Sequence, residues 1–144
     1  MQEIDLLRRA AADMWNLELI LNQNITDPVQ LDIAAYHLQQ VVEKTMKFEM
    51  SQNGVEFEWT HEIDVLINQM EDAGLKVNHW IKESASILTK YAVKTRYHSS
   101  LVAGRTNIEE LLPKVKDYLE QQQCQQKLLQ FVPKSNNFGE SRNI

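Results

Sequence analysis

The sequence contains little of what a β-rich, disulfide-linked or membrane-spanning protein needs. Only four glycines and three prolines are present, so few turns of a many-stranded β fold could be built from it. A single cysteine, Cys124, excludes an internal disulfide and any metal site that needs several thiolates. No apolar run approaches the about 20 residues of a membrane span, and the first residues lack the apolar segment of a signal peptide. These absences predict a soluble, cytoplasmic, all-helical protein.

The common nucleotide-binding and hydrolytic motifs are also missing. The chain has no GxxxxGK[ST] phosphate loop, no GxGxxG fingerprint, no HExxH zinc motif and no GxSxG nucleophile motif. Its four histidines lack a chelating spacing along a helix, so we expect no metal site and no cofactor. The net charge of −5 argues against binding a polyanion through bulk charge, although a local basic patch is compatible with it.

Hydrophobic periodicity predicts five helices in one domain. They are expected near residues 3–22, 27–51, 60–74 and 78–95, followed by a fifth that opens with a Thr106–Glu109 capping box. We therefore predict an all-α, up-and-down bundle of four main helices plus a short additional one. The bundle is expected to span residues 1–132, with a flexible C-terminal tail over residues 133–144.

The second predicted helix has two faces that differ in chemistry. Asp27 is a suitable N-cap, and Pro28 suits the first helical position. One face is a core-facing stripe of Leu31, Ala34, Leu38, Val41, Val42, Thr45 and Phe48. The other is polar and consists of His37, Gln40, Lys44, Lys47 and Ser51. A polar stripe of this kind is either a solvated helix face or the wall of a ligand site.

Other candidates lie in the segments between helices. We expect the apolar residues that follow the second helix to pack against the bundle, namely Val55, Phe57 and Trp59. His61 follows Thr60, the predicted N-cap of the third helix, and is either a ligand-binding group or a local hydrogen-bond partner. Residues 96–105 are predicted to form a loop in which Arg96 and His98 bind phosphate and Tyr97 stacks on a base, or in which they cap the fourth helix. We expect Asp13, on the first helix, to be a surface residue.

Three segments together resemble the HEPN family, named for higher eukaryotes and prokaryotes nucleotide-binding. They are AAYHLQQVVEKTMKFEM (residues 34–50), THEIDVLINQMEDAG (60–74) and LTKYAVKTRY (88–97). The resemblance implies a helical bundle, often a homodimer, that binds a nucleotide or substrate beside a small nucleotidyltransferase in a toxin–antitoxin-like pair. It also implies the shared set of site residues, which would be His37, Gln40, Glu43, Lys44, Lys47, His61, Arg96 and Tyr97.

A second branch of this family cleaves RNA without a metal and carries an Arg-x4–6-His motif. Counted from Arg96, the histidine would stand at Leu101, Val102 or Ala103, whereas His98 follows by only two positions. His98 also replaces the family's usual proline after the Arg-Tyr pair. This departure favours a non-catalytic binding protein. The alternatives are a metal-independent ribonuclease that uses Arg96 and His98 on RNA, and a purely structural dimerising module.

Overall fold

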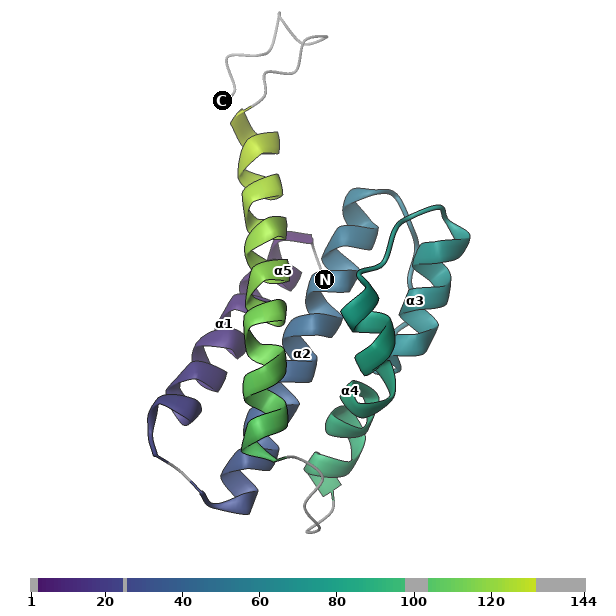
Figure 1. The fold of residues 1–144 in the computed structure, drawn as a ribbon. Coiled ribbons are helices and arrows are strands. Elements are labelled where there is room, and N and C mark those ends of the chain that lie inside the picture. The colour runs from purple at the N-terminus through teal and green to yellow at the C-terminus, as the bar shows by residue number, and fades with distance from the viewer. Residues whose placement is uncertain (1–2, 25, 98–103, 132–144) are drawn as a thin grey trace, which may run out of the picture.

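Five helices form an up-and-down bundle (Figure 1). The computed structural model describes residues 3–24, 26–97 and 104–131, and it contains no strand within them. The helices are α1 (Glu3–Asn22), α2 (Pro28–Gln52), α3 (Ile63–Asp72), α4 (His79–Tyr97) and α5 (Arg105–Phe131). The predicted all-α fold of four main helices and one short helix is therefore confirmed. None of the described helices is long and apolar enough to cross a membrane.

Helix α2 lies at the centre of the bundle and packs against the other four helices. In Figure 1 it runs behind α5, with α1 on one side and α3 and α4 on the other. The predicted core stripe is buried from Ala34 to Phe48, while Leu31 is partly exposed. Because neighbours surround α2, several of its polar side chains are also removed from water. That burial is what gives the polar stripe its unusual environment.

The predicted ends of α2 are confirmed by its hydrogen bonds. The Asp27 side chain accepts a bond from the Val29 amide at 3.0 Å, and Pro28 occupies the first turn. At the other end Asn53 closes the helix, and Gly54 follows with φ +70°, a conformation that favours glycine. Both ends of α2 are therefore marked by signals in adjacent residues of the sequence.

The predicted start of the third helix was wrong by two residues. Helix α3 begins at Ile63 with Glu62 as N-cap, and Glu62 makes no side-chain capping bond. Thr60 instead accepts a bond from the Glu62 amide at 3.0 Å, in a local turn that precedes the helix. The same hydroxyl chemistry that caps helices also builds such turns, so the sequence signal was ambiguous. As a result, His61 lies in the turn before α3.

Helices α4 and α5 differ from their predictions in bounds and in buried face. Arg96 and Tyr97 belong to the last turn of α4 and not to a loop, whereas His98 lies outside the described residues. Helix α5 begins at Arg105, so Thr106 is inside the helix rather than its N-cap. The side chains that α4 buries are Ile81, Ala85, Leu88, Tyr91 and Ala92. The sequence pattern predicted an inner face of Trp80, Ser84, Ile87, Leu88, Tyr91 and Thr95. Leu88 and Tyr91 are buried as predicted, whereas Trp80, Ser84 and Ile87 are only partly buried. The Thr95 side chain and the predicted tail lie outside the described part of the chain.

Helix α5 is joined to α2 by a buried phenol. The Tyr118 hydroxyl donates a hydrogen bond of 2.6 Å to the Glu49 carboxylate, and the Tyr118 ring lies edge-on to Trp80. Burial, together with the adjacent negative charge of Glu49, raises the pKa of Tyr118 well above its usual value. This bond explains how the apolar face of α2 accommodates Glu49. Beyond it, the C-terminal turns of α5 extend past the rest of the bundle (Figure 1).

Replacing Tyr118 with phenylalanine removes only the hydroxyl that donates to Glu49. We expect the free energy of unfolding to fall by about 1.5–3 kcal/mol, the range for a hydrogen bond to a charged group. Urea denaturation of Tyr118→Phe, in the wild-type chain and in Glu49→Gln, measures the coupling between the two groups. Equal losses in the two backgrounds would contradict a contribution from this bond.

Candidate functional site

The polar stripe of α2 is not a solvated face. Gln40 is 5% exposed and Lys47 is 4% exposed, and His37 and Lys44 are partly buried. Buried charges are expensive unless a group of opposite charge accompanies them. Two carboxylates supply these partners: Glu43 from α2 itself and Asp13 from α1. The stripe is therefore organised around two acidic groups.

Glu43 is the centre of the first group. Its Oε2 accepts a bond from Lys47 Nζ at 2.8 Å. Its Oε1 accepts from Gln39 Nε2 at 3.0 Å and lies 2.8 Å from His61 Nδ1. Gln40 Nε2 donates to Gln39 Oε1 at 2.6 Å and lies 3.4 Å from Glu43 Oε1. Since Gln39, Glu43 and Lys47 are spaced by four residues, one helical face supplies most of this network.

This environment keeps the Glu43 carboxyl ionised. Burial alone would raise its pKa, because a charge is poorly solvated away from water. Hydrogen bonds from Lys47, Gln39 and His61, and the positive charge of Lys47, outweigh that effect and hold the pKa of Glu43 below its usual value. Glu43 is thus a fixed negative charge at neutral pH.

Asp13 is the centre of the second group, which contradicts its prediction as a surface residue. Its Oδ1 lies 2.8 Å from His37 Nδ1, and its Oδ2 accepts from Lys44 Nζ at 2.5 Å. Both carboxylate oxygens are therefore engaged by α2. An acidic residue on the flank of an amphipathic helix gave no sign of this role, because its partners are 24 and 31 residues away.

A hollow of about 270 Å³ lies beside Glu43, between α1, α2 and the turn before α3. Its lining residues are Leu6, Glu43, Lys44, Lys47, Trp59, Thr60 and His61. Of the predicted site residues, the structure brings Glu43, Lys44, Lys47 and His61 together here. His37 and Gln40 stand outside the lining, on the same helix. Arg96 and Tyr97 are in the last turn of α4, and their side chains fall outside the description.

Trp59 forms an aromatic corner of this hollow, and Phe57 packs against it from outside the lining. The rings of Phe57 and Trp59 meet edge to face, with centroids 5.3 Å apart. The Lys47 ammonium lies over both rings, 5.5 Å from the Phe57 centroid and 5.3 Å from the Trp59 centroid. Val55 and Phe57 are partly buried against the bundle, as predicted, but Trp59 is 72% exposed. Sequence reasoning therefore missed Trp59 as a site residue, although it stands two positions before His61.

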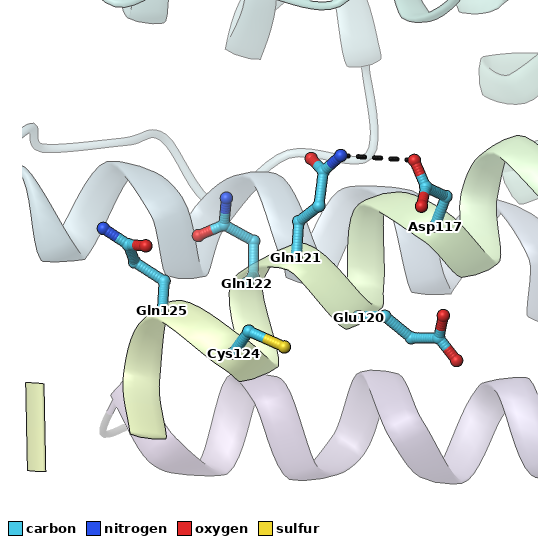
Figure 2. Close-up of a pocket in the computed structure, with 6 residues that line it drawn as sticks. All are labelled: Asp117, Glu120, Gln121, Gln122, Cys124 and Gln125. Atoms are coloured by element: carbon cyan, nitrogen blue, oxygen red, sulfur yellow. Dashed lines mark hydrogen bonds between the residues drawn. The ribbon is translucent and has the colours of Figure 1, made fainter. Parts of the chain in front are cut away.

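A larger hollow follows α5 but involves no second element (Figure 2). All of its lining residues come from α5, namely Asp117, Glu120, Gln121, Gln122, Cys124 and Gln125. Their side chains point to different sides of the helix, and Gln121 donates to Asp117 one turn earlier. Such a surface offers no converging groups for a ligand. In the described part of the chain, no cluster of His, Cys, Asp and Glu could hold a metal ion.

Replacing Glu43 with glutamine leaves the Lys47 ammonium buried without its negative partner. We expect a loss of about 3–5 kcal/mol in the free energy of unfolding at neutral pH. Folding lowers the pKa of Glu43, so the ionised carboxylate stabilises the folded state. This stabilisation is fully present at pH values above the ordinary carboxyl pKa of 4.5, and it is lost as the pH falls through the folded-state pKa. Urea denaturation of the wild type and Glu43→Gln between pH 7 and about 3 should show that their difference in free energy of unfolding becomes smaller as the pH falls.

The control is Glu56→Gln, which removes the same charge from an exposed position. It should change stability by less than about 0.5 kcal/mol at any pH in this range. A Glu43→Gln protein that unfolds with the wild-type profile would contradict the role given to this carboxylate.

Comparison with known proteins agrees with the helical architecture. A solved structure, that of TT1696 from Thermus thermophilus, matches with a TM-score of 0.62 and 23% sequence identity. The match covers 83% of this chain and 97% of that chain, and it shows a shared fold. No curated protein matches. The HEPN domain family model matches residues 4–125, which are most of the 144 residues. The chain therefore belongs to the HEPN domain family.

Proposed function

We propose that this HEPN protein is a non-catalytic nucleotide-binding protein and that its site is the hollow beside Glu43. The observation that carries the proposal is the convergence of Lys44, Lys47 and His61 with the exposed Trp59 around one concave surface. Ligand sites typically combine apolar or aromatic walls with a few polar groups that orient the ligand. An aromatic ring next to hydrogen-bonding groups suits a base with its sugar or phosphate.

His61 is the lining residue best placed to contact a ligand. Glu43 holds its Nδ1, while Nε2 has no hydrogen-bond partner among the residues that the structure describes. The side chain is 49% exposed and lines the hollow. The Glu43 contact fixes the orientation of the ring, which reduces the entropy lost when a ligand binds. The missing Arg-x4–6-His motif supports binding without RNA cleavage.

We further propose that the protein forms a homodimer and acts beside a small nucleotidyltransferase, as the family resemblance implies. Val29 and Ile33 are exposed large apolar residues one turn apart on α2. They lie on the helix that also carries the site, at its N-terminal end. Adjacent exposed apolar side chains are typical of surfaces that a partner covers. We propose this pair as part of the contact between two copies.

Nucleotide binding can be measured by titration calorimetry with AMP, ADP and ATP. The wild-type protein should bind at least one of them, and His61→Ala should weaken that binding by about 10- to 100-fold, as expected for a lost hydrogen bond to a charged group. The matched control is His79→Ala, because His79 is an exposed histidine on α4. It should leave the affinity unchanged.

Two results would contradict the proposed function. The first is the absence of heat with every nucleotide, or equal affinities in the two histidine variants. The second concerns catalysis: cleavage of RNA in EDTA that disappears in Arg96→Ala would establish a ribonuclease instead.

The dimer can be tested by size-exclusion chromatography with light scattering. The wild-type protein should have twice the mass of the chain, and Ile33→Glu should shift it to the monomer, because an unpaired charge in an interface is costly. Leu19→Glu is the control, since Leu19 is an exposed leucine on α1. A monomeric wild-type protein, or a dimer that survives Ile33→Glu, would contradict this contact.

A further inference from the structure

The charges around the hollow cancel in pairs. Lys44 is bound to Asp13 and Lys47 to Glu43, and all four side chains are at most one-fifth exposed. The charges of the two lysines and two carboxylates therefore sum to zero. In three dimensions, both lysines of the predicted polar stripe are neutralised by carboxylates.

This neutrality limits the phosphate groups that the hollow can accept. A phosphate that binds Lys44 or Lys47 must compete with a carboxylate that already holds the ammonium group. A triphosphate would also bring several negative charges close to Asp13 and Glu43, where partial burial strengthens the repulsion. A single phosphate brings fewer negative charges to the same place. The lysines of the described lining already have carboxylate partners, so they offer no unpaired positive charge to balance a triphosphate.

The aromatic corner offers the complementary half of a ligand site. Lys47 lies over Trp59, and Phe57 contacts the ring edge to face, so two neighbours hold the indole in place. At 72% exposure, Trp59 still presents most of its surface to solvent. Bases of any sequence stack on such rings, and removing the ring typically weakens binding by about 5- to 150-fold per base.

We propose that the hollow selects a free nucleobase compound with no more than one phosphate, stacked on Trp59 with its polar groups toward His61. Nucleosides and nucleoside monophosphates fit this description, and nucleoside triphosphates do not. The inference rests on the proposed nucleotide-binding function and specifies its ligand class. Stacking supplies the affinity, and the paired charges reject the polyphosphate.

Titration calorimetry of the full chain with adenosine, AMP and ATP tests this selectivity. AMP should bind at least about tenfold more tightly than ATP, and adenosine should bind within about tenfold of AMP. Trp59→Leu should lower the affinity for AMP by about 5- to 150-fold. Trp15→Leu removes an exposed tryptophan from α1 and should leave the affinity for AMP unchanged. ATP that binds as tightly as AMP or more tightly, or equal affinities in the two tryptophan variants, would overturn the inference but leave nucleotide binding intact. Failure of all three ligands to bind would contradict both the selectivity and the proposed nucleotide-binding function.

A gain of ATP affinity provides the second test, which a loss of folding cannot imitate. Asp13→Asn removes the charge that neutralises Lys44, so the ratio of ATP to AMP affinity should rise by at least about threefold. Asp72→Asn makes the same change in net charge at an exposed position at the end of α3 and should leave the ratio unchanged. An unchanged ratio in Asp13→Asn would show that paired charges do not set the selectivity.

Discussion

The buried carboxylate of Glu43 is the group on which the candidate site depends. It binds Lys47 within α2, and it holds His61, which comes from the turn before α3. Gln39 reinforces this attachment by donating both to Glu43 and to the His61 backbone carbonyl. A carboxylate is an acceptor with room for several donors, so one side chain can orient groups from two segments. The hollow has its shape because this acceptor holds the turn against the helix.

The position of α2 explains why acidic groups take this role. A helix with neighbours on most sides cannot turn all of its polar residues toward water, so its charged groups need partners inside the protein. Asp13, on α1, contacts Lys44 and His37. Glu43 contacts Lys47 and His61 on the side of the bundle near α3. The two pairings leave the surface neutral and place an aromatic corner beside it. This combination underlies the proposal that the hollow recognises its ligand by stacking and shape.

The sequence predicted most accurately those features that depend on neighbouring residues. The ends of α2 follow from Asp27, Pro28 and the Asn53-Gly54 pair, because capping and left-handed backbone are local properties. Errors arose where one signal serves two structures. Thr60 forms a turn in place of a helix cap. On α4, Leu88 and Tyr91 are buried as predicted but Trp80 is only partly buried, since periodicity identifies a stripe more reliably than its exact edges.

The amino-acid sequence by itself determined the helical class, the five elements and the family, because these follow from periodicity and from motifs within short segments. It also placed Lys44, Lys47 and His61 among the candidates. Only the tertiary structure decided what surrounds them. Asp13 reaches Lys44 across 31 residues, and Trp59 remains exposed beside the hollow, which no local pattern encodes. Charge pairing between helices is a property of their packing, and here it gives Lys44 of the predicted polar stripe a carboxylate partner from α1.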